Sequence, residues 1–189
     1  MQRIFLFLFV CASFSACKKT NNDIPDVSSF FGRFNGFAAS ITNATPPGSG
    51  VATSVALNVP ISASQSNGSY TSVISGRDFS VSFTKATLLF SGILTPSSSE
   101  FQGFFSVGNV PYLTPTVPNG IAIGYVDKNG VTWNSALGDQ TGSVFTINQT
   151  QTSGISVKIE AVFNCILYDS GGNKVMLTGG MFTGQFKPL

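Results

Sequence analysis

The most regular pattern in the chain is an alternation of apolar and polar positions between Ile155 and Tyr168. Every second position from Ile155 to Leu167 is apolar, and this set includes Cys165. Successive side chains of a β-strand point to opposite faces, so this spacing places the whole set on one face of a strand, whereas a helix would scatter it. We therefore predict a strand that buries Cys165 as a small apolar side chain. The opposite face of this strand carries Ser156, Lys158, Glu160, Val162, Asn164, Ile166 and Tyr168.

Shorter apolar runs separated by turn signals occupy most of the remaining chain. Asn35-Gly36 lies between two such runs and is a strong hairpin signal, because a type I′ turn needs a positive φ at both positions. No segment has a convincing helical pattern, and prolines restrict the backbone of the longest predicted loop. Turns are predicted at 65–69, 127–130 and 169–173, and loops at 42–50 and 109–120. Strands are predicted at 30–34, 37–41, 51–59, 70–74, 79–90, 101–107, 121–126, 131–134, 143–148, 155–168 and 175–186. The last of these strands is expected to be kinked at Gly179-Gly180.

Many short strands with frequent turns are typical of a β-sandwich or a β-barrel. The sandwich is favoured because each strand has one apolar face and because the proline-rich loop fits a crossing between two sheets. The chain has 18 phenylalanines, which supply bulk for a core between sheets about 10 Å apart. We therefore predict an all-β fold, an antiparallel β-sandwich with a β-barrel as the alternative, in a single domain over residues 30–189.

The first residues of the chain have the three parts of a secretory signal peptide. Arg3 gives a positive start, residues 4–10 form an unbroken apolar run, and Ser15 and Ala16 are small residues beside the expected cleavage site. The apolar run is too short for a membrane span, which needs about 20 residues. Residues 1–16 are therefore predicted to be a signal peptide.

Phe14-Ser15-Ala16-Cys17 resembles the bacterial lipobox, although Phe14 replaces the usual leucine. This resemblance implies that Cys17 carries lipid, and an anchor of more than one acyl chain is stable in a membrane. An ordinary signal peptide, with Cys17 incidental, is the alternative. Residues 17–29 are polar, contain Pro25 and are predicted to form the lipidated Cys and a flexible tether.

The two ends of the chain resemble small Bacteroidota lipoproteins of unknown function. The resemblance lies in residues 154–163, 168–173 and 177–182, which are similar to the closing hairpin of that family, and in the hairpin at Phe34-Asn35-Gly36. It implies a β-rich secreted domain and no established activity, so no functional residue is carried over. In that phylum, acidic residues after the cysteine favour export to the outer face. Here Lys18-Lys19 follows Cys17, which leaves the membrane leaflet open.

The composition excludes several classes of function. Charged residues make up 10% of the chain, against about a quarter of an average soluble domain, and the net charge is +2. There is no basic stripe of the kind that nucleic-acid binding requires. The chain has no histidine, which removes Ser-His-Asp and Cys-His nucleophile systems and histidine metal sites. We predict no metal and no cofactor, and Cys165 would be the one thiol left beside lipidated Cys17.

The candidate chemistry gathers around Trp133, the single tryptophan of the chain. Asp127 and Asp139 flank it and are the one plausible carboxylate pair for glycoside cleavage, which needs two acids facing each other across a cleft. Sugars stack on exposed aromatic rings and bind to polar side chains, so Trp133, Asp127, Asp139 and Gln140 are candidate ligand-binding residues. The structural alternative is that the aspartates form turns and that Trp133 belongs to the core, where tryptophan is mostly buried.

These observations predict an exported, lipid-anchored protein of the bacterial cell envelope, on the periplasmic face or on the cell surface. No catalytic residue is predicted, and the expected role is non-enzymatic binding or an accessory role in a larger assembly. A carbohydrate-binding module, or a weak glycan-processing protein, is the alternative. The expected partners are the bacterial membrane, through lipid on Cys17, and a glycan or an envelope protein.

Overall fold

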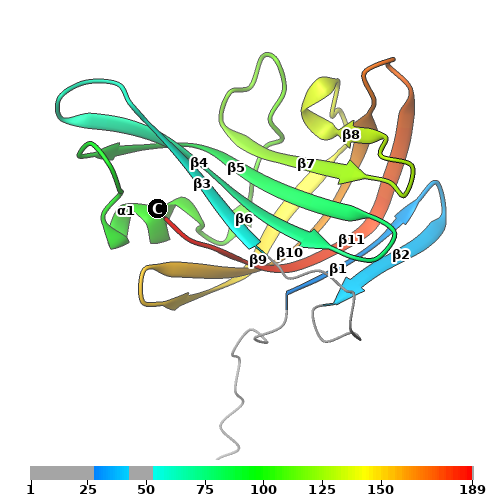
Figure 1. Ribbon diagram of the computed structural model, residues 1–189, viewed down its shortest axis with the longest axis horizontal. Coiled ribbons are helices and arrows are strands. Elements are labelled where there is room, and N and C mark those ends of the chain that lie inside the picture. The colour runs from blue at the N-terminus through cyan, green and yellow to red at the C-terminus, as the bar shows by residue number, and fades with distance from the viewer. Residues whose placement is uncertain (1–27, 43–52, 189) are drawn as a thin grey trace, which may run out of the picture.

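A computed structural model describes residues 28–42 and 53–188 of the chain. The predicted signal peptide, Cys17, most of the predicted tether and residues 43–50 of the loop predicted at 42–50 lie outside these ranges. The described residues form a sheet of 11 strands with one short α-helix and one 3-10 helix (Figure 1). The elements are β1 (Ser29–Phe34), β2 (Phe37–Thr42), β3 (Thr53–Pro60), β4 (Gln65–Ser75), β5 (Ser80–Ser91), α1 (Ser98–Phe104), β6 (Gly108–Asn109), β7 (Gly120–Val126), β8 (Thr132–Asn134), η1 (Ser135–Leu137), β9 (Val144–Ser153), β10 (Ser156–Tyr168) and β11 (Lys174–Phe186).

The sheet consists of two halves that are joined at a single point. One half has the strand order β2-β1-β11-β10, extended by β9 and β6, and the other has the order β8-β7-β5-β4-β3. Both are antiparallel, and the joint is the pair Tyr168 and Asn134 between β10 and β8. Within the described ranges, the end strands β2 and β3 are not paired with each other, so the sheet remains open.

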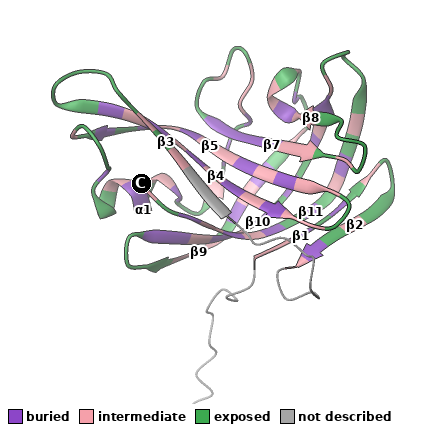
Figure 2. Ribbon diagram, in the orientation of Figure 1, coloured by how far each residue is buried: buried purple, intermediate pink, exposed green. Residues whose placement is uncertain are grey.

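The two halves bury their inner faces against each other, which confirms the predicted all-β sandwich. The rings of Phe83 on β5 and Phe182 on β11 stack with their centroids 3.7 Å apart, and Phe163 on β10 packs edge-on against Phe83 at 5.4 Å. Buried and exposed positions alternate along most strands (Figure 2). Burying each of these rings contributes about 1.5–3 kcal/mol, so the phenylalanine-rich core is the main source of stability.

The long strand predicted from the alternation is β10. Its inward residues from Val157 to Leu167 are buried, and the side chain of Cys165 is 3% exposed. Ile155 was predicted to belong to this buried set but is exposed, because it lies in the turn before β10 begins at Ser156. Burial raises the pKa of the Cys165 thiol to about 12, so the thiol stays protonated and unreactive.

The two glycines that were predicted to kink the last strand form a bulge in β11. The pairing with β10 shifts register between Phe163 opposite Gly180 and Cys165 opposite Leu177. A Cβ atom at Gly180 would lie 2.4 Å from the ring of Phe163, so only glycine fits there. Gly179 has a φ of 57°, which is also a conformation that glycine adopts without strain.

The predicted hairpin at Asn35-Gly36 is confirmed between β1 and β2. Both residues have positive φ values, 47° and 89°. Asn35 also fixes the turn to the last strand: its N–H donates to the carbonyl of Met176 at 2.9 Å, and its side-chain oxygen accepts from the N–H of Met176 at 3.0 Å. The first hairpin of the domain is therefore held by β11.

Two further local predictions are wrong. The segment 101–107 was predicted as a strand, but residues 98–104 form the helix α1, which begins at an N-cap Ser97 in a capping box with Glu100. Residues 65–69 were predicted as a turn, but they form the start of β4. Ser66 and Gly68 are small and occupy buried positions on the inward face of this strand. The hydroxyl of Ser66 donates to the carbonyl of Gly92 at 2.9 Å, which satisfies this buried polar group.

Candidate functional site

The structure places Trp133 on β8, where its ring is half-buried and packs against the core. Its cross-strand neighbour is Tyr125 on β7, whose ring lies 4.2 Å from that of Phe34. Burial raises the pKa of the Tyr125 hydroxyl, with a smaller contribution from the charge of Asp127. Trp133 therefore extends an aromatic group that begins in the core, and part of its ring faces solvent.

The carboxylate of Asp127 is used by its own turn. Its Oδ1 accepts hydrogen bonds from the N–H groups of Asn129 at 2.8 Å and Val131 at 2.9 Å. These bonds close the predicted hairpin between β7 and β8, and Gly130 adopts the positive φ that this turn needs. Asp127 therefore stabilises its own turn, in agreement with the alternative that the aspartates form turns.

Asp139 closes a different turn. Its Oδ1 accepts from the hydroxyl of Thr141 at 2.8 Å and from the N–H of Thr141 at 3.0 Å. The hydrogen bond from the Thr141 hydroxyl is the largest of the causes that lower the pKa of Asp139, and the charge of Lys174 is a smaller one. The carbonyl of Asp139 accepts from the hydroxyl of Tyr168 at 2.6 Å. The two aspartates therefore each serve a separate turn.

Gln140 is buried and fixes the loop after η1 to β10. Its Nε2 donates to the carbonyls of Ser135 at 2.7 Å and Ile166 at 2.6 Å. Its Oε1 accepts from the N–H of Ile166 at 3.1 Å and from the hydroxyl of Ser143 at 2.9 Å. Four hydrogen bonds exhaust the capacity of a primary amide, so no polar atom of this side chain remains for a ligand.

An exposed apolar surface that the sequence analysis did not select lies on the outward face of the half that contains β1 and β11. We call it the outer stripe. Phe31, Met181 and Val162 are direct cross-strand neighbours on β1, β11 and β10. Val144 on β9 pairs with Asn164 and is therefore the diagonal neighbour of Val162. Their side chains are 36%, 57%, 41% and 48% exposed, respectively. Contiguous exposed apolar residues on a soluble domain mark interaction surfaces more often than scattered ones do.

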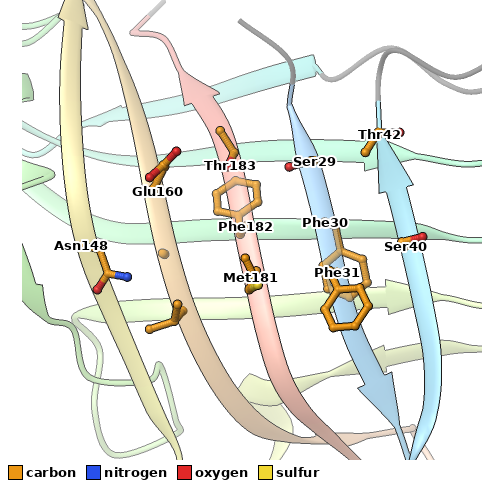
Figure 3. A pocket seen from close by; sticks show the side chains of 12 residues that line it. Ser29, Phe30, Phe31, Ser40, Thr42, Asn148, Glu160, Met181, Phe182 and Thr183 are labelled. Atoms are coloured by element: carbon orange, nitrogen blue, oxygen red, sulfur yellow. The ribbon is translucent and has the colours of Figure 1, made fainter. Parts of the chain in front are cut away.

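A shallow hollow of about 350 Å³ lies beside the outer stripe (Figure 3). In Figure 3, Phe31 and Met181 lie on neighbouring strands, and Ser29, Thr183 and Glu160 form the adjacent polar row. A second hollow adjoins the same Met181 and Val162 on the side of the bulge at Gly179 and Gly180, where side chains are missing. The outer stripe is therefore a ridge between two hollows.

The carboxylate of Glu100 is held by several hydrogen bonds, and its role is local. Its Oε2 accepts from the hydroxyl of Ser97 at 2.6 Å, and its Oε1 accepts from the hydroxyl of Ser91 at 2.7 Å and from the N–H of Ser91 at 2.9 Å. These hydrogen bonds, with that from Ser97 the largest cause, lower the pKa of Glu100 to about 2. Glu100 thus ties the start of α1 to the end of β5.

Residues 28–42 and 53–188 contain no group of three or more carboxylate, cysteine or histidine side chains placed to hold a metal ion. Within the same ranges, no helix has the length and hydropathy that crossing a bilayer requires.

Comparison with protein-family models, with curated proteins and with solved structures gave no match for this chain. The functional interpretation therefore depends on the positions and contacts of the chain's own residues. A signal for the outer stripe was present in the sequence: Val162 is an apolar residue between Glu160 and Asn164 on the mainly polar face of the strand 155–168. Its significance depends on Phe31 and Met181 lying beside it, and only the strand order brings those three together.

Proposed function

We propose that this chain is an exported, lipid-anchored protein of the bacterial cell envelope with a non-enzymatic binding or accessory role. The observation that carries the proposal is the lipobox-like sequence ending at Cys17, twelve positions before the first strand begins at Ser29. A short polar segment between a lipidated cysteine and a folded domain suits a tether. The resemblance of both ends of the chain to small Bacteroidota lipoproteins supports the same assignment.

The hydrogen bonds of the predicted site residues support a non-enzymatic role. The catalytic carboxylates of glycoside hydrolases work in pairs and face a bound substrate. The carboxylates of Asp127 and Asp139 instead bond to the backbone of their own turns, and Gln140 is fully occupied by backbone and Ser143 partners. The outer stripe offers apolar contact area, which suits binding rather than proton transfer.

Metabolic labelling with a palmitate analogue tests the anchor. We expect wild-type protein expressed in a bacterial host to incorporate the label and to fractionate with membranes. Cys17→Ser should abolish both. Cys165→Ser is the matched control, because it removes a buried thiol and should leave the labelling unchanged. Unlabelled wild-type protein that is released in soluble form would refute the proposal. If the protein is labelled, protease treatment of intact cells distinguishes the cell surface from the periplasmic face.

Carbohydrate binding is the second candidate, and the observation that favours it is the partly exposed ring of Trp133. A partly exposed aromatic ring has the chemistry to stack on a sugar. Because the polar groups of Asp127, Asp139 and Gln140 are engaged elsewhere, such a site would depend on Trp133. A glycan array with wild type and Trp133→Ala separates the two candidates.

A further inference from the structure

The first strand of the domain begins beside the outer stripe. Ser29, the first residue of β1, lines the same hollow as Phe31 and Met181. Twelve residues span at most about 43 Å when fully extended. If Cys17 is lipidated, the bilayer surface is therefore within that distance of the hollow.

The charge of the same face is complementary to an anionic surface. The described strands of this half direct one carboxylate outward, that of Glu160, which lies beside the outer stripe. Three cations point outward from the same strands, namely Arg33 on β1, Lys158 on β10 and Lys174 on β11, the last of which also interacts with the charge of Asp139. Basic side chains near an anionic bilayer surface are attracted to it, and exposed apolar side chains insert at the headgroup boundary.

We propose that the outer stripe rests on the bilayer to which lipid on Cys17 ties the chain, with Phe31, Met181 and Val162 in contact with the lipid interface. This inference rests on the proposed lipid anchor and adds an orientation to it. The half of the sandwich that contains β3, β4 and β5 then faces away from the membrane. Its outward side chains, among them the 58% exposed Leu89, are directed toward the envelope space.

Depth-dependent quenching of a fluorophore tests the orientation on the full lipidated protein. A thiol-reactive environment-sensitive dye is attached at Met181→Cys and, in separate protein, at Leu89→Cys, whose exposures of 57% and 58% are matched on opposite outer faces. Cys165 is buried and Cys17 is blocked by its lipid, so the dye reports one position. The protein is reconstituted in vesicles of phosphatidylethanolamine and phosphatidylglycerol, with or without brominated acyl chains.

We expect brominated lipid to quench the dye at position 181 several-fold more strongly than at position 89, with a blue-shifted emission at position 181 only. A second matched pair, Val162→Cys and Val131→Cys at 41% and 40% exposure, guards against misfolding of one variant. Equal quenching within both pairs, or stronger quenching at positions 89 and 131, would overturn the inference. Cross-linking between two copies through position 181 without lipid quenching would also overturn it, and would identify a second copy as the occupant.

Different experimental outcomes contradict the proposed lipid anchor and the proposed orientation on the bilayer. Protein that incorporates no palmitate analogue and does not associate with vesicles contradicts the proposed function. Protein that is labelled and vesicle-bound, but shows no difference between positions 181 and 89, contradicts the orientation alone.

Discussion

Replacing Lys85 by methionine should stabilise the protein at neutral pH. Lys85 lies on β5 between Tyr70 of β4 and Ile121 of β7, and its Nζ lies 4.0 Å from the centroid of the Phe104 ring on α1. Burial removes water from the ammonium group and lowers the pKa of Lys85 from 10.5 to about 8. Below about pH 8 the amine of Lys85 is protonated in both the folded and the unfolded chain, and its charge then opposes folding.

The pKa difference sets the size of the effect. One pKa unit corresponds to about 1.4 kcal/mol, so the charge of Lys85 opposes folding by up to about 3 kcal/mol below pH 8. Water that reaches a partly exposed amine reduces this value. Methionine keeps the apolar length of the side chain, but loses a cation–π contact worth about 0.5–1 kcal/mol. We expect Lys85→Met to raise the free energy of unfolding by about 1–3 kcal/mol at pH 7.

The sign of the pH dependence follows from proton counting. Between pH 8 and pH 10.5 the unfolded chain binds more protons at Lys85 than the folded chain does. Stability of the wild type therefore rises through this range relative to the variant, and the advantage of Lys85→Met disappears toward pH 10.5. The hydroxyl of Tyr70 and the thiol of Cys165 act in the opposite direction, because folding raises their pKa values to about 12, but they do so in both proteins.

Urea denaturation of both proteins from pH 7 to pH 10.5 measures the difference directly. Lys128→Met, which replaces an exposed lysine in the turn between β7 and β8, is the control and should show a difference near zero throughout. The reasoning is refuted if Lys85→Met is less stable than the wild type at pH 7, or if its advantage is the same at both ends of the range.

Three further predictions concern single contacts. The hydrogen-bonded carboxylate of Glu100 contributes stability that is present above about pH 4.5 and is lost as pH falls toward 2, so Glu100→Gln should flatten the acid limb of the stability curve measured by circular dichroism. Gln140→Leu leaves the N–H and carbonyl of Ile166 without their partner and should lower the free energy of unfolding by about 2–3 kcal/mol in urea, whereas an unchanged value would show that water replaces the amide. On a glycan array, Trp133→Ala should give the same binding pattern as the wild type if the domain does not bind carbohydrate through this ring. Binding that the wild type shows and the variant loses would support the carbohydrate hypothesis.

The alternation of side chains was sufficient to predict most strands and the sandwich. A period of two is a property of the backbone, so β10 and the Asn35-Gly36 hairpin could be located without knowing their neighbours. The helix α1 was missed because Phe101, Phe104 and Phe105 have the composition of a strand. The capping box from Ser97 to Glu100 was the available signal, and it outweighs that composition because it satisfies the first free N–H groups of a helix.

The candidate site was harder to predict because it depends on strands that are distant in sequence. Trp133 and the three candidates near it, Asp127, Asp139 and Gln140, could be named from chemistry alone. The turn at Asp127 was also predictable, but the hydrogen bonds of Gln140 to Ser135 and Ile166 depend on how the loop packs against β10. The outer stripe joins position 31 to position 181. No local pattern indicates that these two side chains are neighbours, since only the placement of β11 between β1 and β10 makes them so.

The same placement of β11 has a consequence for the order of events in the cell. β1 obtains its second strand partner only from β11, and the register joins Ser29 to Thr183. A chain threaded through a membrane channel from its N-terminus would deliver β1 first and β11 last, so its sheet could not close during passage. Contacts between such distant segments also form slowly. If the chain is exported as proposed, this topology would leave the sheet incomplete until nearly all of the chain has crossed.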